Sequence, residues 1–310
     1  MSGDRIPGFG KNRRAQTGLL QALGHQPSYT FGMDEWNQDF LRHAPMLAHF
    51  KEWGLQLAGV HWPDRSQVQK ILVAADVRTA SGSPLQVVEP RDGESYEVRV
   101  FRSGELEFRE NNWHDLFNAL AWIVFPKTKA ALNARHHQAL VEERNLPGNN
   151  RGRVRDALTL LDESGVIVAS ADPQLLQMIR EFRWKPLFWE RRLAVSSSMY
   201  WLSLGHALCE KALAPYRGMT GHGLLIEVGN GFFALNDSER AAYIDRQVAE
   251  LIADPSFLTA PDFLSPIPVL GIPGWHDANS CAEFYDDHGY FRPGRRGRKS
   301  AKSGVTGETG

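Results

Sequence analysis

Two predicted helices that meet at one proline place the strongest constraint on how this chain folds. Residues 113–124 carry apolar side chains at helical spacing, with Leu116 and Leu120 on the same face. Proline is tolerated in the first turn of a helix but not in its interior, so Pro126 ends the first helix and begins a second over residues 127–144. We therefore expect the two helices to form a tight hairpin.

Polar side chains interrupt both apolar helices at spacings that place them on shared faces. On the first helix, Asn118 follows His114 by four residues and Asp115 by three. On the second, Asn133 and His136 are three residues apart. Imidazole, carboxylate and amide groups are what a divalent metal ion or a general base requires. We predict a site between the helices, and its candidate catalytic residues are His114, Asn118, Asn133 and His136.

Three carboxylates are candidate metal ligands for this site. Asp115 belongs to the first helix, Asp156 follows the second, and Asp287 lies near the C-terminus. Each assignment has a structural alternative, because Asp115 follows two asparagines and can help to cap its helix. Asn118 and Asn133 can likewise bind loop backbone groups. The cofactor is therefore unknown, and a divalent metal ion is the one that these side chains suggest.

The remaining predicted elements are helices mixed with short β-hairpins. Helices are expected at residues 34–53, with a break near the proline, and at residues 64–76, 172–184, 199–213 and 236–253. Strands are expected at residues 85–88 and 224–228. Alternating apolar residues predict one hairpin over residues 96–108 and another over residues 157–169. This mixture favours an α+β fold over a doubly wound parallel sheet.

Several other polar residues are given structural interpretations. Asp162 and Glu163 precede Ser-Gly, which is typical of a turn, although Asp162 could also add to the site. His206 lies at or within a predicted helix, where a hydrogen-bonded buried histidine is commoner than a catalytic one. His61 and His222 stand alone in the sequence, and we interpret them as structural.

The two ends of the chain are predicted to differ from the part between them. Residues 1–30 look irregular, and the 310 residues are enough for one large domain or two modest ones. Residues 255–293 are rich in proline, glycine and aromatic residues without periodicity, which predicts a long ordered loop. Residues 294–310 are glycine-rich and basic, which predicts a disordered tail.

Charge and hydropathy limit the partners that the chain can have. Its 35 Lys and Arg balance 36 Asp and Glu, so the net charge gives no support for nucleic-acid binding. The basic run 292–299 could contact nucleic acid, although a solvated tail is the simpler interpretation. The apolar run 116–125 is about half as long as a membrane span requires. The N-terminus lacks the apolar core of a signal peptide, so we expect a soluble, cytoplasmic protein.

Several specific motifs extend along the chain from the helix pair to the C-terminal loop. They are Trp113-His114-Asp115, Phe125-Pro126, Leu132-Asn133, Asp156–Glu163, Gly205-His206-Ala207-Leu208, Pro268–Trp275 and Phe284-Tyr285-Asp286-Asp287. In these motifs the chain resembles a proteobacterial family of unknown function, the one numbered 3025, over roughly residues 30–293. The resemblance implies a bacterial protein with a single α+β domain over residues 31–293, and it brings no activity with it. Because the C-terminal motifs belong to the same pattern, we expect that loop to close over the helix pair and form a pocket.

Two functions of different classes are consistent with these features. The first is a metal-dependent hydrolase, for which phosphodiesters are one candidate substrate class. In it His114 or His136 activates water and Asp115 or Asp156 holds the metal. The second is a non-catalytic binding or assembly protein, which would use an aromatic surface around residues 275–291. A nucleic-acid binder acting through the basic tail is a minor third option.

Overall fold

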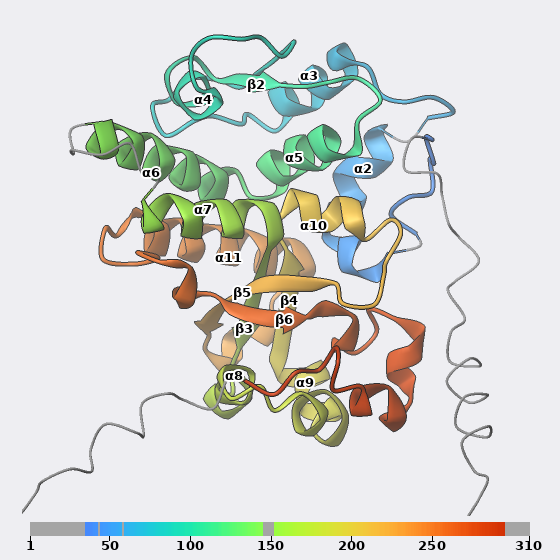
Figure 1. Cartoon of the computed structure of the whole chain (residues 1–310). Coiled ribbons are helices and arrows are strands. Elements are labelled where there is room, and N and C mark those ends of the chain that lie inside the picture. Colours follow the sequence, from blue (N-terminus) through green and yellow to red (C-terminus); the bar gives the residue numbers. More distant parts are fainter. Residues whose placement is uncertain (1–34, 43, 58, 145–151, 295–310) are drawn as a thin grey trace, which may run out of the picture.

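A mixed sheet of four strands forms the centre of the part of the chain that the structure describes (Figure 1). The computed structural model describes residues 35–294, apart from residues 43, 58 and 145–151. The strands follow the order β4-β3-β5-β6, with bounds Met199–Ser203, Gly165–Ser170, Thr220–Glu227 and Ser265–Pro268. β3 runs parallel to β5 and antiparallel to β4, and β6 runs antiparallel to β5. Together with the helices, this sheet confirms the α+β class.

Helices gather on two sides of the sheet. Above it in Figure 1 lie α5 (Trp113–Val124), α6 (Pro126–Arg144), α7 (Arg153–Ser164), α10 (His206–Lys211) and α11 (Asp237–Ala253). Below it lie α8 (Pro173–Arg180), the π-helical turn η2 (Pro186–Glu190), α9 (Arg192–Ser198) and the C-terminal loop. A small parallel sheet of β1 (Gln86–Val88) and β2 (Glu105–Glu107) packs against α3 (Arg65–Ala74) and α4 (Tyr96–Ser103).

The helix pair joined at Pro126 is confirmed with the bounds that the sequence predicts. α5 ends at Val124 and α6 begins at Pro126, and the two helices are in contact. The first backbone N–H groups of a helix have no partner within it. Here the carboxylate of Asp245 in α11 accepts from the N–H of Lys127 at 3.1 Å and of Thr128 at 2.8 Å. The start of α6 is therefore fixed by a side chain distant in sequence.

Other predicted helices are confirmed through their caps. Asp64 and Asn236 each form a capping box, at the starts of α3 and α11. The side chain of Asp172 accepts from Gln174 N at the start of α8. The helix predicted near residues 34–53 is divided into a 3₁₀ helix, η1 (Pro45–Phe50), and α2 (Lys51–Leu57). These starts were predictable because a cap is read from a few adjacent residues.

Both predicted hairpins are wrong. Residues 96–103 form α4, which ends at Gly104 in the left-handed conformation with φ 72°, and the following strand β2 pairs in parallel with β1. Residues 153–164 form α7, which passes directly into β3 at Gly165. Ala157, Leu158 and Leu161 are all buried, since their spacing places them on one helical face. Of the described strands that pair with each other, none are joined by a tight turn.

Two further elements differ from their predictions. The helix expected over residues 199–213 is divided into strand β4 and the short helix α10, because residues 199–203 pair with β3. The long C-terminal loop contains β6 and several 3₁₀ turns. The predicted irregular segment 1–30 and tail residues 295–310 lie outside the described residues. Within the described residues, no helix is long and apolar enough to cross a membrane.

Candidate metal centre

Three helix ends bring two histidines and a glutamate together. His114 lies in the first turn of α5, Glu163 in the last turn of α7, and His206 is the first residue of α10. One ligand atom from each of these residues lies within 4.8 Å of the other two. The two histidine Nε2 atoms are 3.1 Å apart, and Nε2 of His206 is 3.5 Å from Oε2 of Glu163. We call this group the His114–Glu163–His206 cluster.

The two separations that involve His206, 3.1 and 3.5 Å, fit the ligand shell of one metal ion. Zinc binds nitrogen and oxygen ligands at about 2.0–2.1 Å, so ligand atoms around a tetrahedral ion lie about 3.3–3.4 Å apart. Two histidines and one glutamate are a known ligand set of catalytic zinc sites, where water takes the fourth position. The side chains of His114 and Glu163 are 30% and 38% exposed, so this cluster is open to solvent on one side.

A carboxylate lies behind each histidine of the cluster. Nδ1 of His114 is 3.3 Å from Oε2 of Glu210, and Nδ1 of His206 is 3.9 Å from Oδ2 of Asp162. Metal-bound histidines usually donate their second ring N–H to such a carboxylate, which fixes the ring and its tautomer. Nδ1 of His206 is buried and has no hydrogen-bond partner, since 3.9 Å is too long for one. A small rotation of the ring would complete this contact.

The surroundings of the two histidines shift their pKa values in opposite directions, and they favour the neutral, metal-binding form at His206. Hydrogen bonding to Glu210 raises the pKa of His114, whereas burial lowers the pKa of His206 to about 3. His206 is therefore a neutral imidazole at neutral pH, the form that binds a metal ion. Burial alone would raise the pKa of Asp162, but nearby Lys129 and His206 hold it at about 2. Asp162 is consequently ionised, so its carboxylate is a potential acceptor for an N–H at Nδ1 of His206.

The predicted catalytic residue Asn118 lies deeper and is linked to the cluster through Lys129. Nζ of Lys129 donates to Oδ1 of Asn118 at 2.9 Å and to Oδ1 of Asp162 at 2.5 Å. Asn118 in turn donates to the hydroxyl of Tyr96 at 3.1 Å. A row of polar side chains thus leads from the surface at Glu210 to the interior at Tyr96, with a gap of 3.9 Å between His206 and Asp162.

The predicted catalytic residues Asn133 and His136 line a small space beside α4. Nδ2 of Asn133 donates to Oε2 and to the backbone carbonyl of Glu97, both at 2.9 Å. Oδ1 of Asn133 and Nδ1 of His136 are buried without a hydrogen-bond partner. Both residues, together with Lys129 and Asp162, line a cavity of about 10 Å³, enough for about one water molecule. This space is too small for a substrate.

The three aspartates predicted as metal ligands are not brought together. The carboxylate of Asp115 accepts from the backbone N–H and the guanidinium of Arg109 at 2.7–2.9 Å. Asp156 lies in the first turn of α7, seven residues and so about 10 Å before Glu163. Asp287 pairs with Arg217 at 2.5 Å in the C-terminal loop. None of the three contributes an atom to the His114–Glu163–His206 cluster.

The C-terminal loop does not close over the helix pair, contrary to the prediction. Its part after β6 lies below the sheet in Figure 1, whereas α5 and α6 lie above it. This part contacts η2, α9 and their neighbours, as in the ion pair between Lys185 and Asp286 and the bond from Arg192 to the Asn279 carbonyl. The start of the loop, before β6, instead packs on α7 and accepts a bond from Arg135 of α6 at the Phe257 carbonyl. Of its aromatic side chains, Tyr285, Tyr290 and Phe291 are buried in the core. The expected aromatic surface around residues 275–291 is therefore largely turned inward.

The match to a family model decides which family the chain belongs to. A model described as "Protein of unknown function (DUF3025)" matches residues 85–295, about two thirds of the 310 residues. The chain belongs to the DUF3025 family. All three residues of the cluster lie within the matched range, and so do the carboxylates behind its histidines. Searches of the curated proteins and of the solved structures gave no significant match.

The sequence alone indicates structural roles for two of the three cluster residues. The hairpin predicted over residues 157–169 places Glu163 in a turn, and the predicted helix around His206 favours a buried, hydrogen-bonded histidine. A usable signal was present, since His206 and Glu210 are four residues apart on one helix. The helical spacing of Leu158 and Leu161 also pointed to a helix that ends near Glu163.

Proposed function

We propose that this DUF3025 protein is a metal-dependent hydrolase whose metal centre is the His114–Glu163–His206 cluster. The observation that carries the proposal is the convergence of three ligand atoms within 4.8 Å of one another at the ends of three helices. The carboxylates of Glu210 and Asp162 behind the two histidines support it further. Two nitrogens and one oxygen suit a borderline divalent ion such as zinc better than magnesium, which prefers oxygen.

The chemistry follows from the ligand number and from the open side of the cluster. A divalent ion held by His114, Glu163 and His206 would leave a position for water and would supply a hydroxide near neutral pH, the nucleophile for hydrolysis of esters, amides or phosphoesters. Glu210 orients the ring of His114 through its contact with Nδ1, and Asp162 lies behind Nδ1 of His206 at 3.9 Å.

The metal-free cluster must hold a proton that a metal ion would displace. Two imidazole Nε2 atoms 3.1 Å apart form a hydrogen bond only if one of them carries the hydrogen. A bound metal ion needs both lone pairs, so this hydrogen moves to Nδ1 of its own ring if the ring is neutral and is released as a proton only if the ring is an imidazolium. Calorimetric titration in buffers with different ionisation enthalpies measures the release. Because the pKa of His114 is raised, we expect release at pH values below that pKa and a release that falls toward zero as pH rises through it.

The decisive experiment is calorimetric titration of the wild-type protein with Zn²⁺, Mn²⁺ and Mg²⁺. We expect one Zn²⁺ per chain and at least about 100-fold weaker binding in His114→Ala and His206→Ala. His288→Ala is the matched control, because His288 is an exposed histidine of the C-terminal loop. Absence of binding to the wild type, or equal binding to His206→Ala, contradicts the metal centre.

Hydrolysis itself needs a separate assay. Nitrophenyl esters and phosphoesters offered to the zinc-loaded protein should be hydrolysed, and Glu163→Gln should lose about 100-fold or more of that rate. If the ion binds tightly but neither substrate class is hydrolysed above the rate with free zinc, the hydrolase part of the proposal is wrong.

A further inference from the structure

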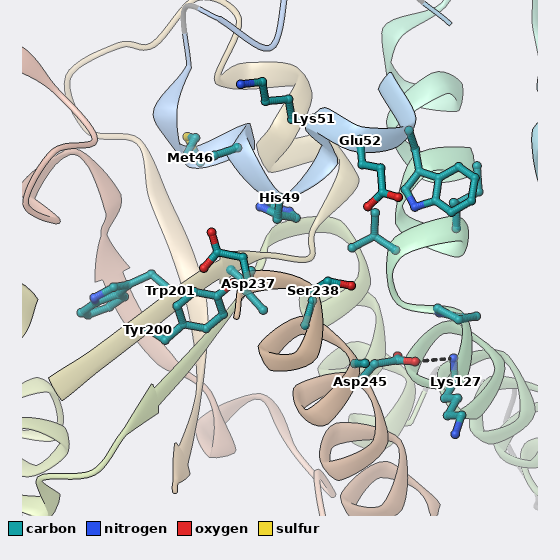
Figure 2. A pocket seen from close by; sticks show the side chains of 18 of the residues that line it. Met46, His49, Lys51, Glu52, Lys127, Tyr200, Trp201, Asp237, Ser238 and Asp245 are labelled. Carbon is teal, nitrogen blue, oxygen red and sulfur yellow. Dashed lines mark hydrogen bonds between the residues drawn. The ribbon is translucent and has the colours of Figure 1, made fainter. Parts of the chain in front are cut away.

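The outer edge of the central sheet, at β4, opens into a groove of about 800 Å³. Figure 2 shows Tyr200 and Trp201 of this strand beside the first turn of α11. Leu202 lines the groove as well, so three consecutive residues of β4 reach it. Successive side chains of a strand point to opposite faces, so three in a row reach one groove only along the edge of the strand. β4 has such an edge, because it ends the sheet order β4-β3-β5-β6.

Trp201 turns its backbone N–H and C=O away from β3. In an antiparallel pair, every second residue exchanges both of its backbone hydrogen bonds with the neighbouring strand. Backbone bonds at the two ends of this pairing, at Ser198 and Leu204, set the alternation. Tyr200 and Leu202 therefore bond to β3, and the N–H and C=O of Trp201 point toward the outer edge.

The chain itself occupies the outer edge on both sides of Trp201. The N–H of Met199 donates to the carbonyl of Val195, and the carbonyl of Ser203 accepts from Nε2 of His49 at 2.8 Å. Among the residues that the structure describes, none makes a hydrogen bond to the backbone N–H or C=O of Trp201 at this edge. Backbone groups require partners, and one donor beside one acceptor on a strand edge is complementary to another extended backbone.

The charged side chains of the groove balance one another. Its lining has three carboxylates and three cationic groups, which are Glu52, Asp237 and Asp245 against Lys51, Lys127 and Arg246. Asp237 pairs with Arg240 at 3.4 Å, and Asp245 accepts from backbone N–H groups of α6. His49 is neutral at physiological pH, because burial lowers its pKa to about 4. The lining thus matches an uncharged occupant, which has no charge to desolvate on entering.

Apolar side chains make up much of the remaining lining. Met46 comes from η1, Trp53 and Leu55 from α2, Ile123 from α5 and Pro126 from the start of α6. Leu55 is 50% exposed although it is a large apolar side chain. A strand laid along β4 would direct every second side chain toward such walls.

We propose that this groove binds an uncharged, extended peptide segment of a partner protein, which adds to the sheet as a further strand beside β4. The segment accepts from the N–H of Trp201 and donates to its C=O, while its alternate apolar side chains pack on the walls. In this mode of recognition, main-chain hydrogen bonds give affinity and the pockets for alternate side chains give specificity. No residue of the His114–Glu163–His206 cluster lines the groove, so the proposal does not depend on the metal centre.

The capped pentapeptide acetyl-Thr-Val-Thr-Val-Thr-amide is the probe, and NMR follows its binding to the full-length protein. Selective isotope labelling of tryptophan nitrogen gives one backbone amide signal for each of the nine tryptophans, and the signal lost in Trp201→Ala belongs to Trp201. We expect a Kd on the order of 1 mM, because a short flexible peptide must be ordered on binding. Binding should shift the Trp201 amide signal and slow the hydrogen exchange of that amide.

Two variants at one position isolate the backbone donor. Trp201→Pro removes the outward N–H and the indole, whereas Trp201→Ala removes the indole alone. Proline is tolerated on an edge strand where its nitrogen faces away from the sheet, so the pairing with β3 is kept. We expect Trp201→Pro to bind the peptide about three- to tenfold more weakly than Trp201→Ala, which is the usual contribution of one hydrogen bond. His206→Ala should bind it as the wild type does.

The same peptide N-methylated at its three central residues is the matched control ligand. It keeps every side chain but cannot donate to the Trp201 carbonyl, so the wild type should bind it at least about tenfold more weakly. This comparison decides the question even if neither Trp201 variant binds the peptide. Equal binding of the two peptides, equal affinity of the two variants, no binding up to about 10 mM, or an unchanged Trp201 amide in the complex each overturns the proposal. Protection of that amide at rising protein concentration without peptide would place a second copy of the chain on the edge, which also overturns it.

Discussion

Lys129 is an ammonium group with only 4% of its side chain exposed, held between Asn118 and Asp162. A charge this deep in a protein is tolerated when it is paired and its hydrogen bonds are made. Its partner Asp162 faces His206, so Lys129 also sets the charge behind one histidine of the cluster. Lys129 therefore contributes both to the stability of the interior and to the position of Asp162 beside the proposed ligand His206.

Removing this lysine should destabilise the protein strongly. Lys129→Met leaves the Asp162 carboxylate without its counterion, which costs about 3–5 kcal/mol in the free energy of unfolding. Urea denaturation measures the loss, and Lys211→Met at an exposed lysine is the control. The double variant Lys129→Met, Asp162→Asn should lose less than the sum of the two single variants. Additive losses would show that the pair does not interact.

His49 gives a prediction for the dependence of stability on pH. Its pKa in the folded protein is about 4, below the 6.5 of the unfolded chain, so the unfolded state binds its proton first as pH falls. The contribution of His49 to stability is complete above pH 6.5 and is lost as pH falls from about 6.5 to 4.

The measurement compares the free energy of unfolding at pH 7.5 and pH 4.5 in two variants. Wild type and His288→Gln should lose the same amount between these pH values. His49→Gln should lose about 2 kcal/mol less, because a neutral glutamine takes up no proton in either state. An identical pH dependence in all three proteins would mean that His49 is not desolvated in the folded state.

At the scale of elements, the junction between α7 and β3 positions Glu163. The helix passes into the strand without a loop, and a Cβ on Gly165 would lie 2.2 Å from the Leu161 carbonyl oxygen. Only glycine lets the strand start this close to the last turn of the helix. The junction therefore holds Asp162 and Glu163 at a fixed place beside α10.

Gly165→Ala should disturb this junction. The backbone must shift to relieve the contact, so we expect a loss of about 1–3 kcal/mol in chemical denaturation and weaker metal binding. Gly229→Ala is the control, because a Cβ there meets nothing within 4 Å and its φ is −72°. A Gly165→Ala variant as stable as Gly229→Ala would show that the junction adapts freely.

At the scale of the molecule, the proposed metal ion would cross-link three helices from different parts of the chain. A ligand that binds only the folded state stabilises it by about 2.7 kcal/mol at a concentration 100 times its Kd. Zinc should therefore raise the Tm of the wild type, chelation should reverse the rise, and hydrogen exchange should slow in α5, α7 and α10. His206→Ala should show no rise, whereas a rise equal to that of the wild type would place the ion elsewhere.

The sequence by itself determined the elements whose signals are local. Pro126 set the boundary between α5 and α6, and Asp64, Asp172 and Asn236 marked the starts of three more helices, because a cap or a proline acts on adjacent residues. The family was also recognisable from its motifs, and the match over residues 85–295 confirmed it. His114 was identified as a candidate because it is a polar residue in an apolar helix.

Only the tertiary structure decided which polar residues meet. Residues 199–203 became a strand because β3 offered an edge to pair with, and no local pattern specifies such a partner. Glu163 and His206 joined His114 because the end of α7 and the start of α10 both meet the start of α5, although the three residues lie far apart in the chain. Local propensity fixes the helices, but packing fixes where their ends meet, and the candidate site is formed by those ends.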